Sequence, residues 1–198
     1  MTEIHNALRF GAGWTNRLPH PTERWAARLF DGLVLSLPLW FALSALATIW
    51  TPSSANLFGG TDPGARVFQI LVGAVIDIPV YALFVGVWGV TPGKLMFGVR
   101  VSWANGGSIG WSAALVRELR VWVFGLGLGI PLVSLLTLLN SRNELNNTGY
   151  TQWDREGGTV VTHRPKGARH DISIAVGIAA IVLGYMASFA ASLMASRP

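Results

Sequence analysis

The sequence predicts an all-α integral membrane protein with three transmembrane helices, a re-entrant or in-plane helical hairpin and at most a small cytoplasmic β-ribbon. Only 13% of its 198 residues are charged and 51% are hydrophobic, whereas a soluble domain averages about 25% charged residues. Three segments are long and apolar enough to cross a bilayer, which takes about 20 residues. A fourth apolar segment contains glycines and a proline that disfavour one straight helix.

The three predicted spans cover approximately residues 25–50, 67–88 and 172–194. Trp50 stands at the end of the first span, where interfacial aromatic residues are common. Asp171 directly precedes the third span, and we expect it to cap that helix.

The fourth apolar segment, Trp111–Ser141, has two interpretations. Its apolar part contains alternate glycines followed by a proline: Gly125, Gly127, Gly129 and Pro131, within Val121–Leu139. One interpretation is a complete crossing with a kink. The other is a helix, a turn and a second helix that returns to the same side, shielded by neighbouring protein because open backbone is costly in lipid.

The distribution of basic residues favours the returning hairpin. If the segment crosses, the loop Arg142–Arg169 lies outside with five basic residues: Arg142, Arg155, Arg164, Lys166 and Arg169. If it returns, thirteen of the fifteen basic residues are cytoplasmic, and only Arg66 and Arg197 lie outside. We therefore expect a multi-pass protein of a cell (inner) membrane with a cytoplasmic N-terminus. The preference for Arg over Lys points to a bacterial source.

Two polar segments are candidates for a two-stranded ribbon. Met96–Gly107 alternates β-branched residues and ends in Asn-Gly-Gly, a turn signal. Gly157–His163 is a second short run with β-forming residues. With the hairpin topology both runs lie on the cytoplasmic face, so their pairing would tie the two ends of the hairpin together.

Charged residues inside the first two spans form a candidate ion or ligand site of Arg28, Asp31 and Asp77. Asp31 is too short to reach the headgroups, so it must face protein, find a cationic partner or be protonated. Asp77 is about 16 Å of helix beyond Arg66, close to mid-membrane, with Pro79 two residues later. Acids beside a broken helix near the midplane are typical of ion sites, although buried charges also serve as structural links between helices.

No enzyme, metal or cofactor is expected from the remaining motifs. There are no cysteines, which excludes disulfides and Cys-based metal sites. The histidines lack metal-ligand spacing and are expected to be solvated or to face headgroups: His5, His20, His163 and His170. Thr91–Gly98 does not match a P-loop, Gly125–Gly129 does not match a dinucleotide fingerprint, and no catalytic constellation is visible. The net charge of +5 reflects arginines on one membrane face rather than nucleic-acid binding.

Four motifs in order carry a family resemblance. They are RWAARLFD (Arg24–Asp31), TPGKLMFGVRV (Thr91–Val101), LVRELR, which contains Arg117 and Arg120, and WDREGGTVV, which contains Asp154. The chain resembles the RDD family of membrane proteins, named for one arginine and two aspartates. The likeness covers about residues 24–161, so the last span lies beyond it, and the polar linker Asn143–Gln152 is longer than the usual basic run.

The resemblance implies roles for specific residues. Arg24, Asp31 and Asp154 carry the family name, and the cytoplasmic loop motif consists of Thr91, Gly93, Lys94 and Gly98. We expect Asp31 to pair with Arg24 or Arg28 on its own helix, or with Arg117 or Arg120 from the hairpin. Asp154 is expected to lie on the same side as Arg24 and to pair with a second arginine. The predicted organisation is a cytoplasmic segment 1–23, an RDD-like membrane domain 24–163 and a linker with the last helix, 164–198.

Two functions stay open on this evidence. One is transport of a small cation, proton or other small ligand by intramembrane carboxylates, in a homo-oligomer whose helices pack through small residues such as Gly177 and Gly184. The other is a non-catalytic membrane scaffold or assembly factor that binds a membrane protein partner through its basic cytoplasmic face. In both cases the lipid bilayer is the expected surrounding.

Overall fold

The computed structural model describes residue 14 and residues 21–165 and 167–195. The predicted cytoplasmic segment 1–23 therefore lies almost wholly outside the described residues, as do His5, His20, Lys166 and Arg197.

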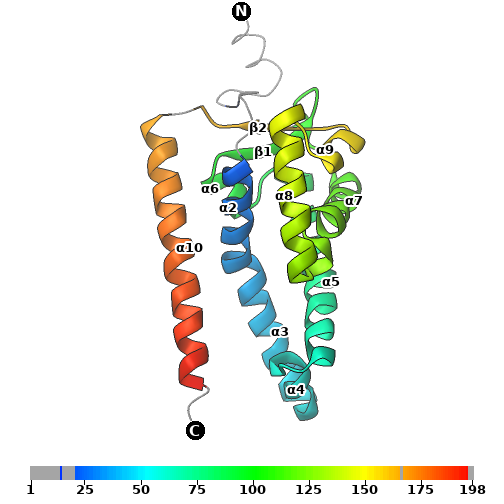
Figure 1. The fold of residues 1–198 in the computed structure, drawn as a ribbon, viewed down its shortest axis with the longest axis vertical. Coiled ribbons are helices and arrows are strands. Elements are labelled where there is room, and N and C mark those ends of the chain that lie inside the picture. The colour runs from blue at the N-terminus through cyan, green and yellow to red at the C-terminus, as the bar shows by residue number, and fades with distance from the viewer. Residues whose placement is uncertain (1–13, 15–20, 166, 196–198) are drawn as a thin grey trace, which may run out of the picture.

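Three long helices confirm the three predicted spans (Figure 1). The first is continuous over Pro21–Trp50, with its middle turn wound as a π-helix. It consists of α2 (Pro21–Asp31), η1 (Gly32–Ser36) and α3 (Leu37–Trp50). The second is α5 (Pro63–Trp88) and the third is α10 (Ala168–Ala195). Each is long and apolar enough to cross a bilayer. Asp171 lies inside the first turn of α10, so the expectation that it precedes and caps that helix is wrong.

A short helical loop joins the first two spans at the end of the bundle opposite the sheet. It contains η2 (Pro52–Ser54) and α4 (Ala55–Gly59). Asp62 caps α5 by accepting a hydrogen bond from the Ala65 amide at 3.0 Å. The side-chain amide of Gln69 donates to carbonyls in and after α4, those of Leu57, Phe58 and Gly60. These bonds hold the loop against the start of α5.

The fourth apolar segment is a hairpin and not a crossing. It contains α7 (Trp111–Arg120), η3 (Val121–Gly125), η4 (Gly127–Gly129) and α8 (Pro131–Thr148). Gly127 and Gly129 have positive φ angles of 55° and 75°, which only glycine adopts readily. A Cβ on Gly127 would lie 2.7 Å from the backbone carbon of Val133, so the two arms approach too closely for any side chain.

A two-stranded antiparallel sheet joins the two ends of the hairpin, as predicted. β1 (Val99–Trp103) precedes α7 and β2 (Thr159–His163) follows α8, and they pair from Val99 with His163 to Trp103 with Thr159. Because β1 and β2 pair, the chain must come back after the hairpin to the same end of the bundle at which the hairpin began.

Short helices lead into both strands. These are α6 (Pro92–Met96) and α9 (Gln152–Glu156). The predicted linker Asn143–Gln152 is therefore mostly helical, since α8 continues to Thr148.

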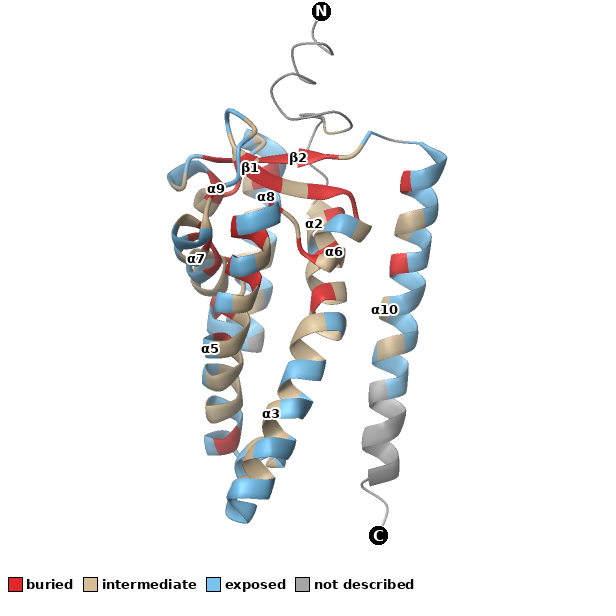
Figure 2. Cartoon of the chain, turned by 180° about the vertical axis from the view of Figure 1, so that it is seen from behind, coloured by how far each residue is buried: buried red, intermediate tan, exposed pale blue. Residues whose placement is uncertain are grey.

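The buried core lies at the sheet end, the end of the bundle that carries β1 and β2 (Figure 2). Its members include Val85, Phe97, Val99, Val101 and Ala114. Towards the opposite end the helices expose apolar side chains, and α3 has no buried residue. This is the pattern of helices whose outer surface is in contact with lipid.

Helix α10 packs beside α2 and η1 through small residues. A Cβ on Gly177 would lie 2.7 Å from the Phe97 ring, and one on Gly184 would lie 2.8 Å from Leu33. Both glycines therefore allow close approach within one chain, the kind of helix contact that small residues favour in membranes.

Candidate functional site

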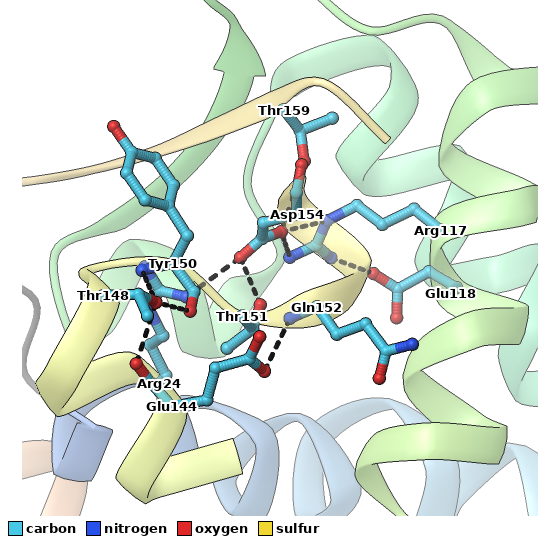
Figure 3. A network of polar contacts seen from close by, with 10 residues as sticks. All are labelled: Arg24, Arg117, Glu118, Glu144, Thr148, Tyr150, Thr151, Gln152, Asp154 and Thr159. Carbon is cyan, nitrogen blue, oxygen red and sulfur yellow. Dashed lines mark hydrogen bonds and ion pairs between the residues drawn. The ribbon is translucent and has the colours of Figure 1, made fainter. Parts of the chain in front are cut away.

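Three family-motif and hairpin residues form a buried ion-pair cluster at the sheet end (Figure 3). Arg24 Nη1 donates to Asp154 Oδ2 at 3.0 Å. Arg117 donates to Asp154 Oδ1 from Nε at 3.0 Å and from Nη2 at 2.8 Å. The hydroxyls of Thr151 and Thr159 add bonds to the same carboxylate at 2.7 and 3.2 Å. The structure thus brings Arg24 together with Asp154 and supplies a second arginine, as the sequence predicts.

Glu118 extends this cluster towards the first span. Arg28 Nη1 donates to Glu118 Oε2, and Arg117 Nη1 donates to Glu118 Oε1, both at 2.8 Å. Burial disfavours the charged carboxylate, but Arg28, Lys94 and Arg117 together outweigh it and lower the pKa of Glu118 to about 2. The carboxylate is therefore ionised at neutral pH.

The pKa values of the other charged groups in the cluster are also set by burial and by neighbouring charges. Burial favours neutral Asp154, but Arg117 and Arg24 outweigh burial and hold the pKa of Asp154 below its usual range. Burial also opposes the charge of Arg117, whereas Asp154 and Glu118 raise the pKa of its guanidinium. For Lys94, burial is the largest influence and lowers the pKa of the ammonium, although Glu118 and Asp31 act in the opposite direction. Removing one partner of such a cluster leaves an uncompensated buried charge.

Asp31 binds the start of α6 rather than an arginine. It is fully buried. Its Oδ2 accepts from Thr91 Oγ1 at 2.5 Å, and its Oδ1 accepts from the Gly93 amide at 2.7 Å. A Cβ on Gly93 would lie 2.1 Å from the Ala27 carbonyl oxygen, so only glycine fits under α2. The loop motif is therefore a docking contact between α6 and the first span.

Within the described part of the chain, Asp31 forms no salt bridge with the arginines expected to pair with it, although the charges of Lys94 and Arg28 act on its carboxyl group. The four arginines named as its partners lie near other carboxylates: Arg24 and Arg117 bind Asp154, Arg28 binds Glu118, and Arg120 lies 3.9 Å from Glu156. Backbone and hydroxyl donors suit Asp31 because its short side chain faces α6 directly.

The remaining loop-motif residue, Gly98, allows the turn from α6 into β1. Its φ of 64° lies in the left-handed region. A Cβ there would lie 2.9 Å from the Cβ of Arg164, which follows β2.

Asp77 lies away from this cluster, in a groove of about 490 Å³ between the first span, α5, the hairpin and α10. The lining polar residues are Arg28, Ser36, Gln69, Asp77, Tyr81 and Tyr185. A second hollow of about 390 Å³ shares Trp40, Gln69, Ile70 and Gly129 with it and reaches Arg66 at the opposite end of α5. Asp77 is half-buried, and Ser36 interacts with its carboxylate.

Three of the residues that line the groove, Arg28, Ser36 and Tyr81, contact one another. Tyr81 and Ser36 share a hydrogen bond of 2.8 Å between their hydroxyl oxygens. The Arg28 guanidinium lies 4.1 Å above the Tyr81 ring. Asp31, the acid expected to share a site with Asp77, is not among the residues that line the groove, although the charges of both acids reach Tyr81.

Comparison with known protein families gives one informative result. The model of the RDD family matches residues 18–194, most of the chain. The chain belongs to the RDD family. Neither the comparison with curated proteins nor the comparison with solved structures gives a match.

The RDD match is longer than the motifs alone indicate. The sequence likeness was expected to end near Val161 and to exclude the last span, but the family match continues to residue 194. That expectation is wrong, and α10 is part of the RDD region. Its contacts agree, since α10 packs on Phe97 and Leu33 of the preceding segments.

Two histidines of this RDD protein are buried, contrary to the expectation that they are solvated. His163 ends β2 and His170 lies in the first turns of α10. His170 Nε2 lies 3.3 Å from Glu23 Oε1, so it links α10 to the start of α2. His170 belongs to a segment that looks like a loop in sequence because its neighbours are polar, whereas His163 ends the β-forming run Gly157–His163.

Glu118 is the site residue that sequence reasoning misses. It lies between two arginines in the motif LVRELR, where an acid is usually a solvated helix residue. The sequence does hold one indication of its role. Asp154 alone cannot pair with three arginines, Arg24, Arg28 and Arg117, so a second acid was needed.

Proposed function

We propose that this RDD family protein carries a small positively charged solute across the membrane, with Asp77 as its binding group. The observation that carries the proposal is the position of Asp77, a half-buried carboxylate in a groove between membrane-crossing helices. Acidic residues inside membrane spans are costly and usually functional. By contrast, Asp31 of the first span, Glu118 of the hairpin and Asp154 of α9 are buried and bonded to internal partners.

The groove is well suited to a moving solute. Arg66, Gln69, Asp77 and Tyr81 recur on one face of α5, and both hollows follow that face. From Arg66 to Tyr81 is about 22 Å of helix, most of a hydrocarbon core of about 30 Å. The π-helix η1 also borders the groove, and such irregular turns are frequent at functional sites.

We further propose that the sheet end faces the cytoplasm of a bacterial inner membrane. Arg100, Arg117, Arg120, Arg142 and Arg155 all lie in the segments at or near this end. Arg66 is the basic residue at the start of α5, the opposite end. The positive-inside rule then makes the sheet end cytoplasmic. We propose no catalytic step for the protein.

Flux in proteoliposomes tests the proposal. Purified wild type, Asp77→Asn and Asp171→Asn are reconstituted at equal folded amounts, and proton, sodium and choline fluxes are measured under imposed gradients. Asp171 is an exposed acid at the start of α10, so it controls for the loss of one negative charge. We expect flux in wild type and Asp171→Asn, and a loss of about tenfold or more in Asp77→Asn, because the solute loses its counter-charge.

Absence of flux in wild type for all three solutes would contradict the proposal. It would favour the scaffold alternative, in which the basic sheet end binds a membrane protein partner. Native mass spectrometry of the same preparation reports whether the protein is a monomer or a homo-oligomer.

A further inference from the structure

The walls of the Asp77 groove are rich in aromatic rings. Trp40, Trp122, Tyr81 and Tyr185 all line it. Ring faces attract cations, most strongly when the cation is desolvated, and clustered aromatic side chains are how proteins recognise quaternary ammonium groups. A carboxylate among such rings adds the counter-charge.

The size and chemistry of the groove suit an organic cation better than a metal ion. A volume of about 490 Å³ is within the range of small-molecule sites, roughly 300–1,000 Å³. Hard metal ions such as Ca²⁺ take about six to eight oxygen ligands. The groove offers one carboxylate, Asp77, and a few neutral polar groups, and no group of three His, Asp or Glu residues suited to a metal occurs in the described residues.

Arg28 is the basic residue of the groove wall, and it is paired with an acid that does not line the groove. Its Nη1 is 2.8 Å from Glu118 Oε2, and this carboxylate partly neutralises its charge. Its guanidinium also covers one face of the Tyr81 ring, so the other aromatic residues of the lining, Trp40, Trp122 and Tyr185, are the candidates for contact with a ligand. Asp77 is the acidic residue among those that line the groove, and the charge of Arg28 offsets it in part.

We propose that the groove binds an alkylated ammonium ion, with Asp77 as counter-ion and Trp40, Trp122 and Tyr185 as the aromatic wall. The inference rests on the proposed function in one respect, that the groove is the ligand site. It adds the chemical class of the solute, an organic ammonium rather than a proton or a metal ion.

Isothermal titration calorimetry on the full chain in detergent tests the inference without any variant. Choline is compared with 3,3-dimethylbutan-1-ol, a neutral molecule of the same shape in which carbon replaces nitrogen. We expect choline to bind at least about tenfold more tightly, because the neutral molecule has neither charge pairing nor cation–π attraction. Equal affinities, or no choline binding, would overturn the inference.

Variants of the wall and of the counter-ion locate the site. Asp77→Asn is expected to weaken choline binding by about tenfold or more. Trp122→Leu is expected to weaken it by roughly threefold to thirtyfold, while Trp122→Phe retains most of the affinity because a ring remains. Trp111→Leu is the matched control, since Trp111 is 49% exposed and does not line the groove. Equal affinity in Trp122→Leu and Trp111→Leu would place the ligand elsewhere.

The binding experiment and the flux experiment can give different outcomes, so they test the two proposals separately. Choline binding without flux of any solute would contradict the transport proposal alone. Proton or sodium flux that depends on Asp77, without choline binding, would contradict the ammonium inference alone.

Discussion

The carboxylate of the sheet-end cluster, Asp154, has many internal partners, whereas the carboxylate of the groove, Asp77, has few. In the cluster, Asp154 receives bonds from two arginines and two threonines. In the groove, Asp77 interacts with the hydroxyl of Ser36 and with the charge of Arg28. The two regions are joined by Arg28, which bonds Glu118 on one side and lines the groove on the other.

This difference separates a structural role from a binding role. A carboxylate whose lone pairs are already used by internal donors has nothing left for a solute, and its removal leaves buried cations unpaired. A half-buried carboxylate with few donors retains capacity for a cation. The comparison predicts that changes in the cluster act mainly on stability, whereas changes in the groove act mainly on binding and flux.

The largest loss of stability is expected for Asp154→Ala. It leaves Arg24 and Arg117 buried without their shared carboxylate, which should cost about 3–5 kcal/mol. Thermal unfolding and the yield of monodisperse protein in detergent measure the effect. Asp171→Ala removes an exposed acid and should be nearly neutral. A melting temperature for Asp154→Ala equal to that of the control would refute the structural role of the cluster.

A decline in stability at low pH is expected next. A carboxyl group with a depressed folded-state pKa stabilises the fold above its unfolded pKa, and this contribution is lost as the pH falls through the folded value. For Glu118 the window runs from 4.5 down to about 2, which corresponds to a contribution on the order of 3 kcal/mol. Asp154 changes in the same direction. Unfolding followed from pH 7 to pH 2.5 should show constant stability to about pH 5 and then a fall; a flat profile would count against paired carboxylates.

The contact of α6 with the first span is expected to fail in Gly93→Ala. The new methyl group would lie 2.1 Å from the Ala27 carbonyl oxygen and 2.9 Å from Asp31 Cγ. Backbone must therefore shift, at a cost of about 1–3 kcal/mol. Gly73→Ala is the matched control, because a Cβ there has no neighbour within 4 Å and alanine favours helix. Equal melting temperatures for the two variants would contradict the tight docking of α6.

The sequence predicts the backbone arrangement better than the pairing of charges. Long apolar runs define the spans, and the distribution of arginines indicates the hairpin, because both properties are local or additive along the chain. The partner of Asp31 is different, since Thr91 and Gly93 come from a helix some 60 residues away. Position in sequence suggests nearby arginines, but the short Asp31 side chain and the space below Gly93 decide the contact.

Glu118 and His163 illustrate the same limit. Both are polar residues with polar neighbours, which in sequence indicates exposure, yet both are fully buried. They are buried because the β1–β2 pairing and the return of the hairpin close over them. Burial of this kind depends on tertiary topology and is not visible in any single segment. Asp77 could be identified because its segment is so apolar that one acid stands out.

The smallest effect on stability is expected for Asp77→Asn, even though it should reduce binding and flux by about tenfold or more. The amide keeps the volume of the carboxyl group and its oxygen can interact with Ser36 as the carboxylate does. It also removes the desolvation cost of a half-buried charge in a membrane span. The change in unfolding free energy should therefore be under about 1 kcal/mol, and it can be stabilising. Comparing the unfolding of Asp77→Asn with that of Asp154→Asn tests whether the two acids have different roles. If Asp77→Asn destabilises the protein as much as Asp154→Asn does, then Asp77 is also a structural group. The groove would then lose its only candidate counter-charge among the described residues that line it.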